Sequence, residues 1–190
     1  MAKSTDSLNK KLLQAAISAT KASDIKKLVE AGADINVHNE WGLTPVMLAA
    51  QYNHCVAVLK ALIELGGDIH EAEPKYRSNA LHLAANNSDN PKVIETLLSA
   101  GANIDARNYL GETALIMAVN NNSETKIATQ LIKCGADINV CDYQGHSVLD
   151  YAKAVKKTYI INLLKNSGAK WVIIVTKTLR HGNSMPFVLY

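Results

Sequence analysis

The sequence predicts an all-α repeat protein, a solenoid of stacked helix–turn–helix units joined by projecting turns. Three observations support this prediction. Two short motifs recur at a nearly constant interval along the chain. Helix-capping residues and glycines stand at matching places in each copy. Hydrophobic residues make up 48% of the chain and aromatic residues only 5%, which suits thin layers of Ala, Leu, Ile and Val helices better than a β-sandwich or barrel.

The first motif is a helix-capping residue followed by apolar residues at helical spacing. Its copies are TPVMLAA from Thr44, NALHLAA from Asn79, TALIMAV from Thr113 and SVLDYAK from Ser147, and they start 35, 34 and 34 positions apart. A Ser, Thr or Asn side chain at this place can accept a backbone N–H of the first helical turn. Pro45 suits the next position, where the missing N–H costs nothing. We therefore expect the first helix of each unit to begin here.

The second motif marks where the second helix of each unit ends. Its copies are EAGADIN from Glu30, ELGGDIH from Glu64, SAGANID from Ser99 and KCGADIN from Lys133, with a partial copy, NSGAK, from Asn166. Glycine favours the left-handed conformation that stops a helix. The glycines expected there are Gly32, Gly66, Gly101, Gly135 and Gly168. Further glycines at Gly42, Gly111 and Gly145 predict a turn before the next cap.

Together the two motifs resemble the ankyrin repeat family over roughly residues 7–170, and the Asn-Pro start of a second helix at Asn90 resembles its bacterial members. The resemblance implies helix pairs and projecting β-turn fingers that stack side by side. We expect a repeat domain over residues 1–170 and a non-repeat tail over 171–190. The units are expected at about 7–38, 39–72, 73–107, 108–141 and 142–170.

Some segments depart from the pattern. The finger between Gly66 and Asn79 is one residue longer than the others and has Arg77 where they have glycine, so we expect it to have its own shape. Residues 7–31 are predicted to form an N-terminal capping helix pair. Residues 172–176 are strand-like, and we expect the tail to cover the last helix pair. A cleaved or disordered tail is the alternative.

No motif points to catalysis, a cofactor or a metal, and we expect a chain that is not an enzyme. The family resemblance implies that His82 ties neighbouring repeats together by hydrogen bonds. Cys134, Cys141 and His146 lack the paired spacing of common zinc sites. Three cysteines, no apolar stretch of about 18 residues and no apolar leader favour a cytoplasmic monomer. Delivery into a host cell without a signal is left open.

The resemblance implies that the chain binds another protein, on the concave face formed by the fingers and the first helices. Each of four fingers carries one aromatic residue, which could anchor a partner or could simply pack the fingers together. The expected contact residues are Glu40, Trp41, Leu43, Gln51, Tyr52, Lys75, Tyr76, Ser78, Asn86, Asn87, Tyr109, Leu110, Glu112, Asn120, Asn121, Tyr143, Gln144 and His146.

Charge suggests an alternative function. Residues 151–190 hold seven basic and no acidic side chains, although the net charge of the chain is only +3. This end could bind nucleic acid or an anionic membrane, and such binding should weaken steeply as salt increases. The favoured alternative is that these lysines are simply solvated on a last helix and a tail. Aromatic residues are poorly interleaved with these basic ones, so nucleic acid is the less favoured partner.

Overall fold

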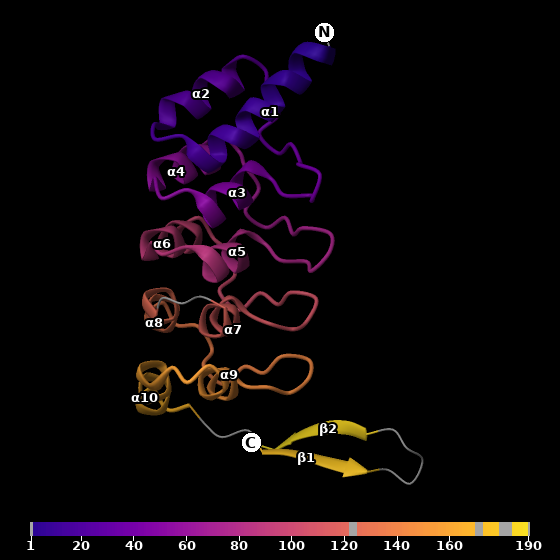
Figure 1. Cartoon of the computed structure of the whole chain (residues 1–190), viewed down its shortest axis with the longest axis vertical. Helices are drawn as coiled ribbons and strands as arrows, with labels where there is room; N and C mark the ends of the chain where they lie inside the picture. The colour runs from indigo at the N-terminus through magenta and orange to yellow at the C-terminus, as the bar shows by residue number, and fades with distance from the viewer. Residues whose placement is uncertain (1, 122–124, 170–172, 179–183, 190) are drawn as a thin grey trace.

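A computed structural model describes residues 2–121, 125–169, 173–178 and 184–189. These residues form ten α-helices and two β-strands (Figure 1). The elements are α1 (Ala2–Ser18), α2 (Ala22–Glu30), α3 (Pro45–Tyr52), α4 (Val56–Glu64), α5 (Ala80–Asn87), α6 (Pro91–Ser99), α7 (Ala114–Asn120), α8 (Thr125–Lys133), α9 (Val148–Ala154), α10 (Thr158–Asn166), β1 (Ile173–Thr178) and β2 (Ser184–Leu189).

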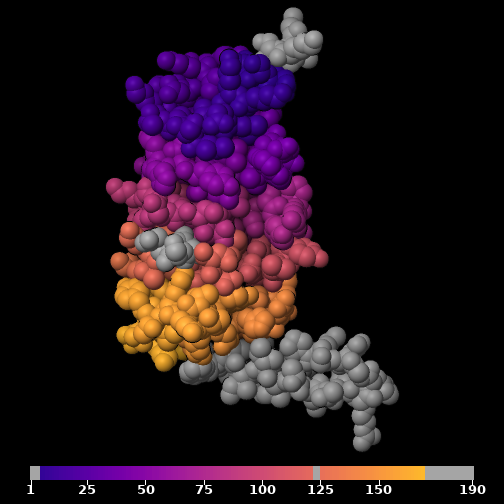
Figure 2. Space-filling view, viewed as in Figure 1, coloured from indigo at the N-terminus to yellow at the C-terminus, as the bar shows by residue number. Residues whose placement is uncertain are grey.

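The helices form two parallel rows. Helices α1, α3, α5, α7 and α9 each contact the next member of an inner row, and α2, α4, α6, α8 and α10 do the same in an outer row. Turns project from the inner row on the side away from the outer row (Figure 1). Successive units appear as consecutive layers along the long axis (Figure 2). This arrangement confirms the predicted all-α stack of helix pairs.

The expected helix boundaries follow from capping chemistry. The side chains of all four predicted N-cap residues, Thr44, Asn79, Thr113 and Ser147, accept a backbone N–H from the first turn of their helices. Asn90 caps α6 in the same way, with Pro91 in the first position. The five glycines after the second helices have φ between 88° and 101°. Only glycine adopts this conformation without strain, so each second helix stops there.

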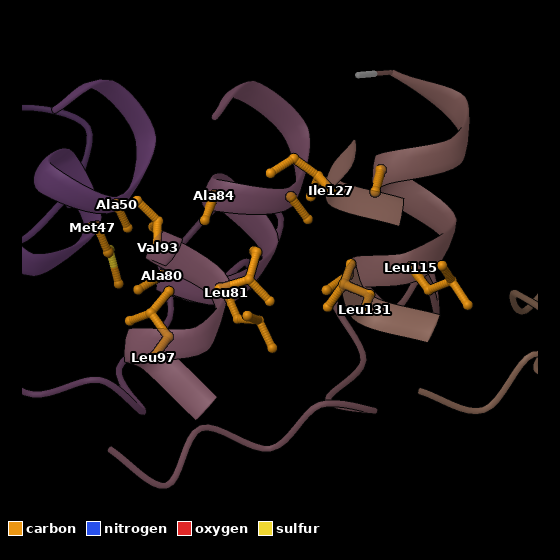
Figure 3. Packing of buried hydrophobic residues seen from close by; sticks show 14 of the residues in the cluster. Met47, Ala50, Ala80, Leu81, Ala84, Val93, Leu97, Leu115, Ile127 and Leu131 are labelled. Atoms are coloured by element: carbon orange, nitrogen blue, oxygen red, sulfur yellow. The ribbon is translucent and has the colours of Figure 1, made fainter. Parts of the chain in front are cut away.

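The core is one continuous layer between the two rows (Figure 3). Inner helices contribute small residues such as Ala50, Ala80 and Ala84, which let neighbouring helices approach closely. Outer helices contribute fully buried branched side chains such as Leu97 and Leu131. Each repeat buries its apolar face only by packing against its neighbours, so the stack is stable as an array and not as separate units.

The two ends of the stack differ. The predicted N-terminal capping pair is present as α1 and α2, which pack on α3 and α4. At the other end β1 and β2 form an antiparallel pair in which Ile173 is opposite Leu189 and Thr178 is opposite Ser184. The predicted strand is therefore present from Ile173, whereas Val172 lies outside the described residues. The side chains of the tail also lie outside them, so its role as a cover stays a prediction.

Candidate functional site

Four fingers project from the inner row: residues 39–43, 73–78, 108–112 and 142–146. Three of them have five residues and are closed by an Asn or Asp at the base, namely Asn39, Asn108 and Asp142. The base side chain accepts the backbone N–H groups of the residues two and four positions later, as in Asn108 Oδ1 with Leu110 and Glu112, both at 2.9 Å. A single short polar side chain therefore fixes the shape of each five-residue finger.

The second finger has six residues and a longer side chain at its base. Glu73 replaces Asn or Asp, and its two carboxylate oxygens accept the N–H groups of Lys75, Tyr76 and Ser78 at 2.7–3.1 Å. Arg77 has a φ of 55°, in the left-handed region that Gly42, Gly111 and Gly145 adopt in the other fingers. The expectation that this finger has its own shape is confirmed, since one extra residue is matched by one extra methylene at the base.

Adjacent fingers meet differently along the stack. The Tyr109 N–H donates to Tyr76 O at 2.7 Å, and the Tyr143 N–H donates to Leu110 O at 3.0 Å. The residue at the corresponding place in the second finger is Pro74, which has no N–H to donate. Pro74 instead packs so closely on Gly42 that a Cβ there would overlap its ring. The first and second fingers thus meet through van der Waals contact, and the later ones through backbone hydrogen bonds as well.

A groove of about 840 Å³ lies between the first three fingers and the inner helices α3, α5 and α7. Leu83 and Met117, from the helices, supply apolar surface to its lining. The exposed aromatic side chains along it are Trp41, Tyr52 and Tyr76, which are 68%, 48% and 47% exposed. Large apolar side chains left open to water beside a hollow are typical of surfaces that bind another molecule.

The groove unites most of the residues predicted from the sequence. Those lining it are Glu40, Trp41, Leu43, Gln51, Tyr52, Lys75, Tyr76, Ser78, Asn86, Leu110, Glu112 and Asn121. The remaining predicted residues, Asn87, Tyr109, Asn120, Tyr143, Gln144 and His146, do not line it. Sequence reasoning missed Gly42, Glu73, Pro74, Leu83, Asn108 and Met117. The finger bases among them could have been found, because a polar residue stands three or four positions before each turn glycine or Arg77.

The four finger aromatics do not form one row along the groove. Trp41 and Tyr76 line it, whereas Tyr109 and Tyr143 do not. In the five-residue fingers Trp41 is the third residue and the two tyrosines are the second, and in the third finger Leu110 takes the third place and lines the groove. Tyr143 lies beside the Arg107 guanidinium, with 5.8 Å between its ring centre and Cζ.

Two of the predicted contact residues are buried, which corrects their expected role. Ser78 is 3% exposed and Glu112 is 8% exposed. The Ser78 N–H donates to Glu73, and Asn108 Nδ2 donates to Glu112 Oε2 at 2.9 Å. Both residues directly precede an N-cap and lie against the stack, so they offer little surface to a partner.

An amide cluster stands on the groove side of α3 and α5. Gln51 Nε2 and Asn86 Nδ2 both donate to Asn87 Oδ1, at 3.2 Å and 2.7 Å. In the described part of the chain, Gln51 Oε1 and Asn86 Oδ1 are shielded from solvent and accept no hydrogen bond. An acceptor left unsatisfied in this way costs about 1–3 kcal/mol.

His82, in the unit of residues 73–107, links that unit to the third finger, which confirms the structural role expected for it. Its Nε2 is 3.0 Å from Ala106 O and 3.2 Å from Glu112 O, so this nitrogen carries the proton and donates. Nδ1 accepts from the Asn79 N–H and completes a capping box. Burial lowers the pKa of His82 below its ordinary value, which favours the neutral ring.

The basic C-terminal segment is partly engaged within the fold. Lys157 Nζ donates to Ala118 O at 3.4 Å, and burial lowers the pKa of this lysine. Lys153 is 3.9 Å from Asp150. Residues 170–172 and 179–183, which include Lys170 and Arg180, lie outside the described residues. Within the described ranges no three His, Cys, Asp or Glu residues form a cluster that could hold a metal.

Among the helices of the described segments, none is both long and apolar enough to span a bilayer.

Residues 12–108 and 81–173 match the protein family described as "Ankyrin repeats (3 copies)". The human protein "SH3 and multiple ankyrin repeat domains protein 2" is 40% identical over 90 residues, 47% of this chain and 5% of that protein. Human "Palmitoyltransferase ZDHHC17" is 38% identical over 71 residues, 37% of this chain and 11% of that protein. "BRCA1-associated RING domain protein 1" of Caenorhabditis elegans is 35% identical over 89 residues, 47% of this chain and 12% of that protein. The chain therefore spans at most 12% of these three relatives.

Proposed function

The chain belongs to the ankyrin repeat family, and from this premise we propose that it is a protein-binding module whose partner docks in the groove of the first three fingers. The observation that carries the proposal is the group of exposed aromatic side chains Trp41, Tyr52 and Tyr76 along an apolar hollow. Trp and Tyr supply large, rigid contact area with a polar handle, and such residues dominate the energetics of protein interfaces.

The proposal extends to how the module works. Binding through a preformed groove would make the chain an adaptor, an inhibitor or a bacterial effector acting on a host protein. We propose a monomer that acts in the cytoplasm. Support for that compartment comes from three cysteines that are all free in the structure, as is usual where thiols stay reduced.

Two double variants test the groove. Trp41→Ala with Tyr76→Ala removes two aromatics that line it, whereas Tyr109→Ala with Tyr143→Ala removes two exposed finger aromatics that do not. Each tagged chain is used to capture partners from its native cells, with quantitative mass spectrometry as the measurement. We expect the first pair to lose the partner, since hot-spot truncations cost about 2 kcal/mol or more each. The second pair should retain it.

Urea unfolding of both variants ensures that the comparison concerns binding, because truncation of exposed side chains should leave stability nearly unchanged. Equal retention by the two variants would refute docking in the groove. Retention together with a steep decrease of affinity as salt increases would instead support an anionic partner on the basic segment 151–190.

A further inference from the structure

The strand pair that follows the last repeat has two edges with different chemistry. In the described part of the chain, β1 and β2 form a sheet of their own with no third strand. We propose that the edge of β1 binds an extended, acidic segment of a partner protein as a third strand. This site is separate from the groove, because it lies beyond the last helix pair (Figure 1).

The register of the pair shows which backbone groups lie on each edge. Thr176 is opposite Pro186. Because proline has no N–H, these two residues cannot exchange backbone hydrogen bonds. Hydrogen-bonded and non-hydrogen-bonded pairs alternate along an antiparallel ladder. The non-hydrogen-bonded pairs are therefore Ile174 with Val188, Thr176 with Pro186, and Thr178 with Ser184.

The two edges differ in what they can donate. Residues of non-hydrogen-bonded pairs direct their N–H and C=O groups away from the other strand. On β1 these residues are Ile174, Thr176 and Thr178, and each has an N–H to donate. On β2 the middle residue is Pro186, which lacks the N–H and places its ring where an added strand would approach. The geometry thus favours addition of a strand to β1 over addition to β2.

A third strand would supply what the pair lacks. An isolated two-stranded hairpin is only marginally stable in water, whereas three strands can be stable together. Five of the six residues of β1 are Ile, Val or Thr, which favour the extended conformation. Figure 1 shows β2 on the side of the repeats and β1 on the far side. The unpaired edge of β1 therefore points away from the stack and is open to a partner.

Charge indicates which kind of strand fits. Residues 170–190 include Lys170, Lys177 and Arg180 but no Asp or Glu, and Lys177 belongs to β1 itself. Opposite charges on neighbouring strands stabilise their pairing and like charges oppose it. A segment with Asp or Glu is therefore favoured. The same basic segment of a second copy is disfavoured, which agrees with a monomer that binds a different protein.

A peptide selection on the full chain tests the proposal. Random peptides of about 12 residues, longer than a typical strand, are selected in parallel on the unchanged chain and on two variants. Thr176→Pro removes an outward N–H from β1, and Val188→Pro removes one from β2. Neither N–H points to the other strand, so the hairpin should persist in both variants.

Peptides that depend on the edge of β1 should be enriched on the unchanged chain and on Val188→Pro, but not on Thr176→Pro. Peptides that bind the groove would be enriched on all three proteins and are thereby set apart. We expect the edge-dependent peptides to be rich in Val, Ile and Thr, to carry Asp or Glu, and to lack proline. The measurement is their composition relative to the starting library.

The best edge-dependent peptide is then titrated against the same three proteins. We expect Thr176→Pro to weaken its affinity about tenfold or more, because a main-chain hydrogen bond is lost and the ring blocks the added strand. Val188→Pro should change the affinity less than about twofold, since its ring lies on the other edge. The Trp41→Ala/Tyr76→Ala variant should bind this peptide as well as the unchanged chain does.

Amide hydrogen exchange measured by NMR gives a test that needs no variant. On the unchanged chain, the bound peptide should slow exchange at the N–H groups of Ile174, Thr176 and Thr178, because an added strand shields them from water. Exchange at Val175 and Lys177, whose N–H groups face β2, reports whether the hairpin is intact.

Each contrary outcome would overturn the proposal. Equal weakening by the two proline variants, or unchanged exchange at the three outward N–H groups, would refute strand addition to β1. A selection that enriches no acidic peptide would refute the proposed partner segment. A double-stranded oligonucleotide that binds the unchanged chain and Thr176→Pro alike, with no peptide selected, would assign the basic end to nucleic acid. A dimer that Thr176→Pro abolishes in sedimentation velocity would make a second copy the occupant.

Discussion

The first two fingers and the last two carry the same number of aromatic residues but use them differently. Trp41 and Tyr76 line the groove, whereas Tyr109 and Tyr143 stand one place earlier in their turns and do not line it. The backbone N–H groups of these two tyrosines bind the preceding finger. In the third finger the position within the turn makes the difference, because Leu110 at the third place lines the groove and Tyr109 at the second place does not. The fourth finger contributes no residue to the groove lining.

The largest effect should come from breaking the contact between the last two fingers. Gly111 has a φ of 79°, and a Cβ there would lie 2.7 Å from the Tyr143 ring and backbone N. Gly111→Ala should therefore both strain the backbone and displace the fourth finger, at a cost of about 2–4 kcal/mol in the free energy of unfolding. Urea unfolding measures this cost.

The control for this substitution is Gly101→Ala. Gly101 has a φ of 97°, but nothing lies within 4 Å of its added Cβ. Backbone strain alone then predicts a loss of about 1 kcal/mol. If Gly111→Ala and Gly101→Ala lowered the free energy of unfolding equally, the contact between Gly111 and Tyr143 would contribute nothing to stability.

A smaller effect is expected at the base of the second finger. Glu73→Asn should destabilise by about 1–3 kcal/mol, because the shorter side chain cannot reach the three N–H groups that Glu73 accepts. Combining Glu73→Asn with deletion of Lys75 and Arg77→Gly recreates a five-residue finger. We expect this combined variant to recover stability in urea unfolding, and a failure to do so would contradict the match between loop length and base residue.

The most gradual effect concerns the pH dependence of stability and the hydrogen bonds by which His82, in the unit of residues 73–107, contacts the third finger. Burial lowers the pKa of His82 in the folded state, so the unfolded chain binds its proton more readily. Stability should therefore decrease as pH falls below about 6.5, the ordinary value for histidine. His82→Gln should flatten this dependence between pH 7.5 and 5, measured as the urea midpoint. His70→Gln, at an exposed site, should leave it intact.

Much of the fold could be predicted because local chemistry decides it. A capping side chain such as Thr44 and a glycine such as Gly101 fix helix boundaries within a few residues, whatever lies elsewhere in the chain. Repetition then makes each local signal unambiguous. Arg77 was recognisable as an exception for the same reason, since it interrupts an otherwise regular series of turn glycines.

The groove could be predicted only in part because it depends on how turns and layers are oriented. Trp41 and Tyr76 stand three positions before their helix caps, whereas Tyr109 and Tyr143 stand four positions before theirs. This local spacing separates the two pairs, but it does not show which pair lines the groove. Ser78 and Glu112 are next to their helix caps and turn inward, although polar residues in turns are usually exposed. Leu83 and Met117 belong to helices expected in the core, and their partial access to the groove arises only after stacking.

Pro74 has a mechanical consequence. A proline stands where the third and fourth fingers each donate a backbone N–H. The turns of the first and second fingers therefore meet by van der Waals contact, whereas backbone hydrogen bonds connect the second finger to the third and the third to the fourth. Van der Waals contact is less directional than a hydrogen bond. The first finger, which carries Trp41 beside the groove, is therefore the one among the four described fingers whose turn is held to its neighbour without a backbone hydrogen bond.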